Sequence, residues 1–527
     1  MKKRSGCIIL IAMLVLSFAG CENVKKTSTD NPKTAIAREA AETEVSKVGQ
    51  KDSKQDNEQE EDGILVTPLQ SVLGEENVLE GSALKSDGKC YYMISVPNFC
   101  DSNEDGIGDL RGVIKALAYI ENLGCDGICL FDMMSEEEST ENISDYTGIN
   151  EQYGSDEDFL ELINACKKYE MKVLVTLNLN RVSSVSKVDL NKEVIREECA
   201  SMYTKWLDKG IDGFYLAECN RYQTGNDAAN IQFLEWTQQV LKEKKEDIVI
   251  VGEVYDNAET CNQYYKSGIE SFVNGRFSGE YGMIARSILT YAGDYSGTIL
   301  SQKICEVQPG IEMYDADALP AQQLSNNKQG RSSDYFYYNE SQIKLAGAIS
   351  LLMSGNSFLL YGEELGMGGV LEDTSLAGQK ARDCMVPMDW SEKDDDTSKF
   401  VVTSNETDQE GTNPFGSYEE QMEDPLSIYN YYRQVLQVRD AFPSIADGKQ
   451  ECMEQLEDGA VCGIIKSCES ETSYLLINTH NEEVSVTVPK NIYYYHELAA
   501  AIGTDENEIV LQDDTLLLPP YGIAVLK

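Results

Sequence analysis

A short acidic segment near residue 100 carries oxygen donors at alternating positions. They are Asp101, Asn103, Asp105, Ile107 through its carbonyl, and Asp109. Calcium takes about six to eight oxygen ligands from loops of this kind, of which EF-hand loops are one example. Gly106 lets the chain turn sharply among the donors. The spacing therefore predicts a structural calcium site, although the same residues would also suit an acidic, solvated turn kept for its glycine geometry.

Histidine is almost absent, which removes several classes of chemistry. The two histidines, His480 and His496, lie near the C-terminus. A Ser/His/Asp or Cys/His mechanism in the main body therefore has no histidine base, and a His-ligated zinc site there is also excluded. The chain carries 90 Asp and Glu against 44 Lys and Arg, a formal net charge of −46. Because phosphate backbones are held by basic side chains, nucleic acid is excluded as a partner.

Strand-like and helix-like patterns alternate from about residue 90 onward. Apolar runs typical of buried strands cover residues 90–96, 126–131, 172–179, 213–217, 248–254 and 357–361. Apolar residues recur at helical spacing over 110–123, 159–166, 194–207, 231–241 and 342–353, and Ser155 is placed to cap the second of these helices. The repeated units predict an α/β fold with a TIM-type (β/α)8 barrel, whose site lies at the C-terminal ends of its strands.

The pattern of apolar and polar residues changes after Pro443. Short alternating runs such as 474–478 and 484–488 indicate antiparallel strands, which predicts a C-terminal β-sandwich. Residues 22–62, in contrast, hold no aromatic residue and few apolar ones, as is typical of a flexible tether. The predicted domains are a signal segment over 1–20, an acidic tether over 21–62, a barrel over 63–443 and a sandwich over 444–527.

The N-terminus has the features of a bacterial lipoprotein signal. A basic segment at residues 2–4 precedes an apolar run that ends in Ala19-Gly20-Cys21. A basic end, a short apolar core and small residues are typical of a secretory signal, and the stretch 16–21 resembles a lipobox. We expect acylated Cys21 to anchor the mature chain to the outside of the bacterial cell membrane. The alternative is an ordinary signal peptide with a chance cysteine.

Thirteen further cysteines remain besides Cys7 and Cys21, and none belongs to a CxxC pair. Secreted chains rich in cysteine often carry disulfides, mainly where the domain is too small to build a sufficient core. This chain has 527 residues and 42% hydrophobic composition, so a large core needs no such support. We therefore expect mostly free, buried thiols.

Several motifs follow one another in a fixed order. They include Asp101-Ser-Asn-Glu-Asp-Gly-Ile-Gly-Asp-Leu-Arg-Gly112, Gly210-Ile-Asp-Gly-Phe214, Val251-Gly252-Glu253-Val254, Tyr361-Gly-Glu-Glu-Leu-Gly-Met367 and Pro387-Met388-Asp389-Trp390. Together they resemble the α-amylase family, glycoside hydrolase family 13, in particular its oligo-glucosidase and neopullulanase-like members. The resemblance covers residues 90–527 and implies a (β/α)8 barrel followed by a β-sandwich. It also implies that the acidic segment near residue 100 is the calcium loop of the oligo-glucosidase branch.

The resemblance implies where this family holds its catalytic acids, and the chain departs from that pattern. Retaining glycosidases need two carboxylates about 5 Å apart. Glu253 matches the general acid/base of the family. Ala217 stands at the position of the nucleophilic Asp, two residues after Tyr215, which replaces an Arg. Glu218 is adjacent, but an offset of one residue turns its side chain to the other face unless the strand bulges.

The remaining site positions are also changed. The Asn-His-Asp motif of the family aligns with Asn326-Asn327-Lys328, so Lys328 replaces the third acid and Asn327 the histidine. Arg181 replaces the histidine of the third-strand motif. Only residues 181–186 separate that motif from the next recognisable run, so most of the protruding domain B is missing. If Lys328 or Arg181 approaches Glu253, we expect a salt-bridged plug in the barrel mouth.

Two functions follow from these observations. The favoured one is a lipoprotein of extracellular α-glucan metabolism that has lost hydrolysis and acts as a glycan-binding protein or as a partner subunit of another protein. The alternative is an active α-glucan hydrolase or transglycosylase with a rearranged site around Glu253. Loss of a nucleophile removes several orders of magnitude of rate, which is why the first is preferred.

Overall fold

The computed structural model describes residues 63–74, 86–134, 148–179, 190–274, 280–290, 295–326, 330–369, 384–391, 401–402, 413–456 and 458–527. The chain divides into two compact units, Met1–Glu60 and Glu61–Lys527, and every described residue belongs to the second. The signal segment, Cys21 and the tether up to residue 62 lie outside the described residues. Among the described residues, no helix has the length and apolar character needed to cross a membrane.

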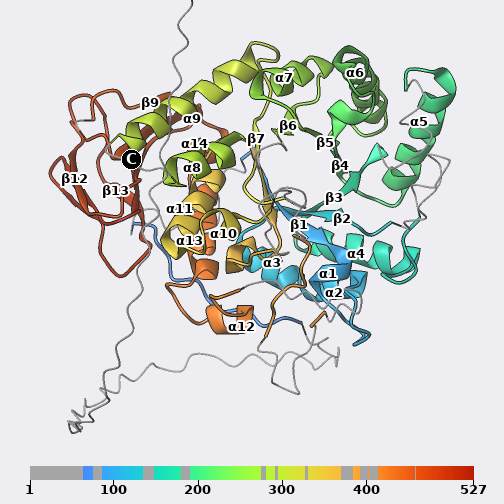
Figure 1. Cartoon of the computed structure of the whole chain (residues 1–527), viewed down its shortest axis with the longest axis horizontal. Helices are drawn as coiled ribbons and strands as arrows, with labels where there is room; N and C mark the ends of the chain where they lie inside the picture. The colour runs from blue at the N-terminus through green and yellow to red at the C-terminus, as the bar shows by residue number, and fades with distance from the viewer. Residues whose placement is uncertain are drawn as a thin grey trace, which may run out of the picture. The chain divides into compact units, whose positions relative to one another are not determined.

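Eight parallel strands form a closed barrel (Figure 1). They are β1 Cys90–Ser95, β2 Gly127–Phe131, β3 Lys172–Leu177, β4 Gly213–Leu216, β5 Val249–Val254, β6 Ser271–Asn274, β7 Ala321–Gln323 and β8 Asn356–Leu360. Each strand pairs with the next in the sequence, and β8 pairs back onto β1, with Tyr91 opposite Phe358. The predicted (β/α)8 barrel is therefore confirmed.

Helices follow the strands and cover the outside of the barrel. Up to β7 they are α1 Val96–Phe99, α2 Leu110–Lys115, α3 Leu117–Leu123, α4 Asp156–Lys168, α5 Glu193–Asp208, η5 Cys219–Arg221, α6 Asp227–Lys244, α7 Ala258–Gln263, η6 Tyr264–Ser267, α8 Glu280–Thr290 and α9 Ser296–Glu312. After β7 come α10 Ser332–Tyr335, α11 Glu340–Leu351, η8 Glu363–Leu365, α12 Tyr418–Gln421, α13 Ile428–Ala441 and α14 Pro443–Asp447.

Two local features show how the sequence sets the helix ends. Ser155 caps α4 as expected, because its hydroxyl accepts from the Asp158 amide while the Asp158 side chain accepts from the Ser155 amide. The single helix expected over 110–123 is instead two, α2 and α3. Ala116, between the two helices, stays in the right-handed region at its edge (φ −90°, ψ −1°), and its amide is shared among the carbonyls of Gly112, Val113 and Ile114.

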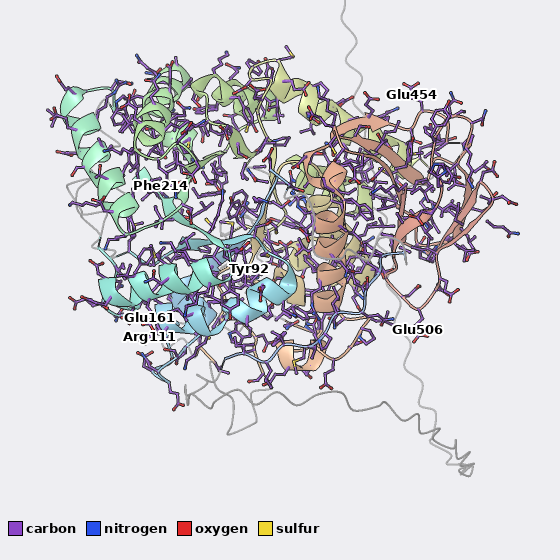
Figure 2. The ribbon with its side chains drawn as sticks, turned by 180° about the vertical axis from the view of Figure 1, so that it is seen from behind. Tyr92, Arg111, Glu161, Phe214, Glu454 and Glu506 are labelled. Carbon is purple, nitrogen blue, oxygen red and sulfur yellow. The ribbon has the colours of Figure 1, made fainter. Side chains whose placement is uncertain are left out.

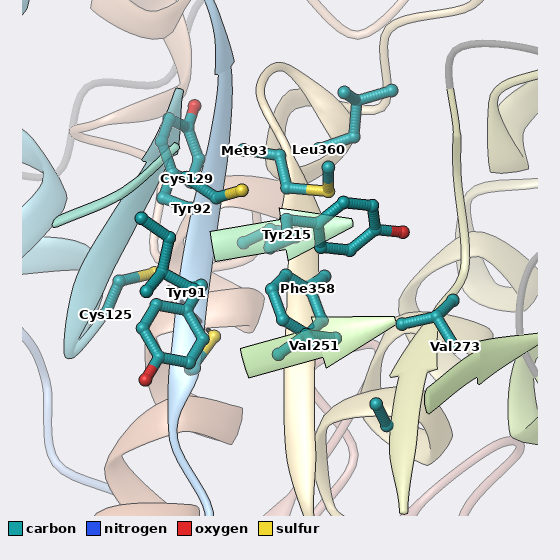
Figure 3. Packing of buried hydrophobic residues seen from close by; sticks show 14 of the residues in the cluster. Tyr91, Tyr92, Met93, Cys125, Cys129, Tyr215, Val251, Val273, Phe358 and Leu360 are labelled. Atoms are coloured by element: carbon teal, nitrogen blue, oxygen red, sulfur yellow. Dashed lines mark hydrogen bonds between the residues drawn. The ribbon is translucent and has the colours of Figure 1, made fainter. Parts of the chain in front are cut away.

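The barrel interior is filled by large side chains (Figure 3). Phe358 on β8 stacks on Tyr91 of β1 with 5.3 Å between ring centroids, and it meets the edge of Tyr215 of β4 at the same separation. Met93 and Val251 complete the layer, and all five residues are buried. Such aromatic pairs add about 0.5–1.5 kcal/mol beyond their area burial. The interior of the barrel is a packed core, so side chains close the barrel beneath its C-terminal mouth.

The C-terminal part consists of two antiparallel sheets, as expected for a sandwich. Their strands are β9 Lys449–Cys452, β10 Val461–Ser467, β11 Thr472–Asn478, β12 Val484–Thr487, β13 Leu498–Ile502, β14 Val510–Gln512, β15 Thr515–Leu518 and β16 Ile523–Leu526. One sheet has the order β13-β16-β11-β10-β9 and the other β12-β15-β14. Figure 2 shows Arg111, Glu161, Glu454 and Glu506 on the outside of the protein, whereas Tyr92 and Phe214 are buried.

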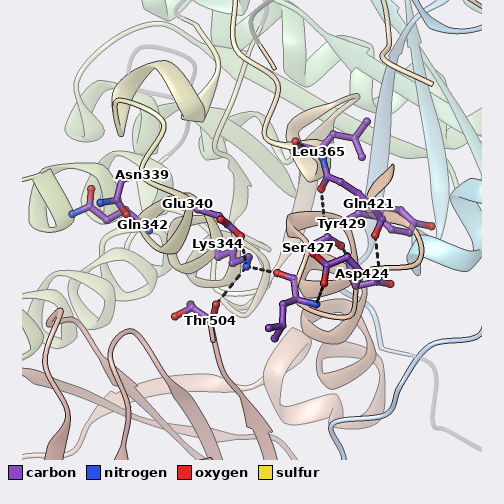
Figure 4. A network of polar contacts seen from close by, with 12 residues as sticks. Asn339, Glu340, Gln342, Lys344, Leu365, Gln421, Asp424, Ser427, Tyr429 and Thr504 are labelled. Carbon is purple, nitrogen blue, oxygen red and sulfur yellow. Dashed lines mark hydrogen bonds and ion pairs between the residues drawn. The ribbon is translucent and has the colours of Figure 1, made fainter. Parts of the chain in front are cut away.

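Lys344 joins the barrel helices to the C-terminal sheets (Figure 4). Its side chain is 2% exposed, and its ammonium group pairs with Glu340 at 2.6 Å. It also donates to the carbonyl of Leu426, before α13, and to that of Thr504, after β13. Because three acceptors surround the buried charge, it is satisfied without being solvated.

The cysteines match the expectation from the sequence. All thirteen within the described residues are free, and ten are buried. Burial raises the pKa of the Cys129 thiol, inside the barrel, to about 12, so it remains protonated.

Candidate active site

The ends of β4 and β5 bring three of the expected site residues together. The strand register pairs Tyr215 with Val251 and Leu216 with Gly252, so Ala217 comes level with Glu253 at the C-terminal ends of the strands. All of them are buried, Glu253 being 4% exposed and Ala217 5% exposed. The residue level with Glu253 at the end of β4 therefore contributes a methyl group.

Among the described residues, donors at the ends of both β4 and β5 contact the Glu253 carboxylate. The hydroxyls of Tyr215 and Tyr255 donate to Oε1 at 3.1 and 3.3 Å, and the Glu218 amide donates to Oε2 at 3.2 Å. Burial and the Glu253 charge raise the pKa of both tyrosines far above the ordinary value, so the phenols keep their protons and remain donors. A general acid must instead carry its own proton and direct it at a substrate oxygen. The contacts of Glu253 suit an anchored carboxylate.

Glu218 does not turn to the outer face of the barrel, which corrects the expectation from strand alternation. Strand β4 ends at Leu216, and Glu218 adopts a left-handed conformation with φ 53° and ψ 43°. This turn keeps its side chain 94% buried at the barrel end, where its carboxylate accepts from Asn178 at 3.4 Å and pairs with Arg221. A single left-handed residue thus redirects the side chain, in the way a bulge would.

Sequence reasoning missed Tyr255, Asn178 and Arg221 as parts of this cluster. Tyr255 lies two residues after Glu253 on the same face, and both carboxylates of the cluster contribute to the raised pKa of its phenol. The guanidinium of Arg221 lies over the Tyr255 ring, 5.3 Å from its centroid. The two-residue alternation along β5 was the signal that would have identified Tyr255.

Three other predicted site residues fall in parts of the chain that the structure does not describe. Arg181, Asn327 and Lys328 lie outside the described residues, so the expected salt-bridged plug on Glu253 stays a prediction. Asn326, at the end of the β7 loop, is buried, and its backbone bridges to Gly330. Asn326 and Gly330 are therefore neighbours in the structure.

The acidic segment near residue 100 forms a tight loop held by its own side chains. Asp101 is buried and accepts from the amides of Asn103, Glu104 and Gly106 at 2.6–3.0 Å. Gly106 has φ 90°, a left-handed turn that favours glycine. The side chain of Asn103 accepts from the Asp105 amide, and that of Asp105 from the Ile107 amide.

Asp109 joins the loop to the helix that follows it. Its carboxylate caps α2 through the Gly112 amide at 2.7 Å and also accepts from the Ser102 amide. In the described part of the chain, no three His, Cys, Asp or Glu side chains converge as a group that could hold a metal ion. Calcium binding by Asp101, Asn103, Asp105, Ile107 and Asp109 stays a prediction.

Comparison with known proteins agrees with this fold. A family model described as the alpha amylase catalytic domain matches residues 94–188 and 181–448. Alpha-amylase 3 of Dictyoglomus thermophilum is 25% identical over 503 residues, which cover 83% of this chain and 92% of the relative. The probable oligo-1,6-glucosidase 3 of Bacillus subtilis is 24% identical over 73% of this chain and 89% of its own length.

The solved structures show the same likeness. Amy13B of Eubacterium rectale is 29% identical in sequence, with a TM-score of 0.77 over 87% of this chain and 99% of that structure. An α-amylase from H. orenii has a TM-score of 0.68 over 84% of this chain and 99% of its own, at 22% identity. With its closed parallel barrel and C-terminal antiparallel sheets, this chain belongs to the α-amylase family of glycoside hydrolase folds.

Proposed function

We propose that this protein is an extracytoplasmic lipoprotein of α-glucan metabolism that binds α-glucan at the barrel mouth without hydrolysing it. The observation that carries the proposal is the methyl group of Ala217 level with Glu253. A retaining mechanism needs a carboxylate there to form the glycosyl-enzyme bond. The positive charge of Lys328 at the third acid position would oppose the positive sugar ring of the transition state.

The ligand class rests on family membership. Relatives named α-amylase and oligo-1,6-glucosidase match most of this chain. A scaffold that has lost its nucleophile still offers a barrel mouth with polar groups, among them the half-buried Asn178 and Tyr255 and the exposed Arg221. Such groups hydrogen-bond neutral, hydroxyl-rich ligands.

The proposed location follows from the N-terminus. Cys21 follows a basic and apolar segment with small residues before it, and a polar stretch of about forty residues separates it from the barrel. Acylated Cys21 would tether the barrel to the outer face of the cell membrane, where α-glucans are met before uptake. Mass spectrometry of the membrane-extracted protein tests this, because a Cys21→Ser variant would carry no lipid.

Calorimetry with maltooligosaccharides, run beside a reducing-sugar assay, tests the main proposal. The expected result is saturable binding with no hydrolysis above that of a Glu253→Gln variant. Turnover that disappears in Glu253→Gln would overturn the loss of hydrolysis. Absence of binding to any α-glucan would overturn the glycan-binding role and favour a partner subunit that acts through protein contacts.

One observation favours an active enzyme as the second candidate. The left-handed turn at Glu218 places a buried carboxylate beside Glu253, with the Glu218 amide 3.2 Å from Glu253 Oε2. Glu218 would then act as a displaced nucleophile, although its ion pair with Arg221 opposes that role. Hydrolysis that is lost equally in Glu218→Gln and Glu253→Gln, with retention of anomeric configuration, would establish this candidate.

A further inference from the structure

Three tyrosines occur within four residues after β7. Tyr335 ends α10, and Tyr337 and Tyr338 lie in the connection to α11 (Figure 1). This connection follows a barrel strand, and in barrels of this type such loops form the C-terminal face that carries the site. The side chain of Tyr337 is 84% exposed, the highest value among the large hydrophobic residues described.

The backbone at Tyr337 and Tyr338 is held in a rarely populated conformation. Their φ angles are 50° and 57°, in the left-handed region that glycine and asparagine favour. A bulky residue with positive φ costs conformational energy, and here two occur in succession. No local need for a large side chain explains Tyr337, because its ring is exposed and contributes little to the core. Strain of this kind is often retained at functional positions.

Hydrogen bonds and close packing fix the backbone next to Tyr337, through Tyr338 and Asp334. The Tyr338 hydroxyl donates to Asp334 Oδ1 at 3.0 Å, and the Gly369 amide donates to Asp334 Oδ2 at 3.1 Å. A Cβ at Gly368 would come within 2.1 Å of the Tyr338 hydroxyl, so the β8 loop packs directly against this ring. Phe336, between the half-buried Tyr335 and the exposed Tyr337, is buried.

One polar side chain packs against Tyr335, and another follows Tyr338 in the chain. The guanidinium carbon of Arg286 on α8 lies 4.1 Å from the centroid of the Tyr335 ring. Asn339 begins α11 and accepts from the Gln342 amide. Aromatic faces beside fixed hydrogen-bonding groups suit a ligand that is apolar on one face and polar at its rim.

We propose that Tyr337 is a stacking platform for one hexopyranose ring of an α-glucan, outside the residues that family members use for catalysis. The inference rests on the proposed glycan-binding function and assigns it a residue. A pyranose ring presents an apolar face and a rim of hydroxyls, which matches an exposed phenol held on a rigid base. With a net charge of −46, the protein would repel a polyanionic ligand, whereas a neutral glucan is unaffected.

Stability and affinity should move in opposite directions at this position. Tyr337→Asn replaces the ring with a residue that tolerates the left-handed backbone, so the melting temperature should rise. The dissociation constant for maltoheptaose, measured by calorimetry, should increase about ten-fold. Tyr337→Trp keeps a stacking ring and should bind within about two-fold of the unmodified protein. A purely structural role would lower stability and affinity together.

Tyr494 provides the matched control. It is 79% exposed in the C-terminal part, so Tyr494→Ala removes a similar ring elsewhere and should leave binding unchanged. Glucan binding that persists unchanged in Tyr337→Asn would overturn the platform while leaving the proposed function intact. Absence of glucan binding by the unmodified protein would overturn both. Equal losses of glucan affinity in Tyr337→Asn and Tyr494→Ala would overturn the assignment of the platform to the connection between α10 and α11.

Discussion

The hydroxyl of Tyr215 donates to Glu253 across two neighbouring strands, with 3.1 Å between the oxygens. The resemblance to the α-amylase family places an arginine at position 215 and its nucleophile at 217. A neutral phenol and a methyl group therefore stand where a cation and a carboxylate are expected. Glu253 retains its place on β5, but the groups around it hold it as an acceptor.

Restoring the missing acids should not restore an ordinary enzyme. We expect the Ala217→Asp, Lys328→Asp double variant to hydrolyse aryl α-glucosides at least about three orders of magnitude more slowly than active family members. The reason is that Tyr215, Arg181 and Asn327 leave the new carboxylates without the groups that orient them. Initial rates with and without Glu253→Gln measure this. Ordinary turnover by the double variant would show that the two acids were all that was missing.

Calcium should stabilise the folded protein if the loop at Asp101 binds it. A ligand that binds only the folded state raises the free energy of unfolding by about 2.7 kcal/mol when its concentration is a hundred times its dissociation constant. The melting temperature should therefore rise with calcium and fall on chelation, and Asp105→Ala should remove the dependence. Asp505→Ala, in another exposed acidic loop, is the control and should keep it. A melting temperature that changes with neither calcium nor chelator would contradict the predicted calcium site.

Glu363 should make stability fall as the pH rises from about 4.5 to 7. Burial raises the pKa of this carboxyl from 4.5 to about 7, in spite of its bonds to the Ser325 amide and Tyr432 hydroxyl. Between these values the folded state holds a proton that the unfolded state has lost. The stabilising contribution is complete below pH 4.5 and declines by roughly 3 kcal/mol up to pH 7.

Denaturation curves at several pH values test this linkage in Glu363→Gln. The amide can still accept from Ser325 and donate to Tyr432, so the variant should fold and show a shallower decline. Some slope should remain, because burial also raises the pKa of Glu364. An unchanged slope would mean that Glu363 titrates normally in the folded protein.

Removal of the Lys344 ammonium should loosen the contact between barrel and sandwich. Lys344→Met keeps the length of the side chain but leaves the carbonyls of Leu426 and Thr504 without this donor. We expect a loss of about 1–3 kcal/mol in the free energy of unfolding. Lys303→Met breaks an exposed ion pair with Glu306 and should cost less than about 1 kcal/mol. Equal effects of the two substitutions would contradict the role given to Lys344.

The sequence by itself determined the barrel and much of its site. Six of the eight strands were recognisable because a parallel sheet covered on both faces requires continuous apolar runs, as in β1. The spacing of Tyr215 and Ala217 also came from local information, since strand alternation directs side chains two residues apart to the same face. The replacement at Ala217 needed no structure at all.

Only the tertiary structure decided the features that depend on partners distant in the sequence. Strand β7 contains Gln322 and Gln323 and has no apolar run, yet both are buried, and Gln322 bonds to carbonyls that follow α11. The direction of Glu218 depends on one left-handed residue whose amide is bound by Glu253 on the next strand. Neither apolar periodicity nor spacing carries that information, because both report which face is buried and not which polar group supplies the compensating hydrogen bond.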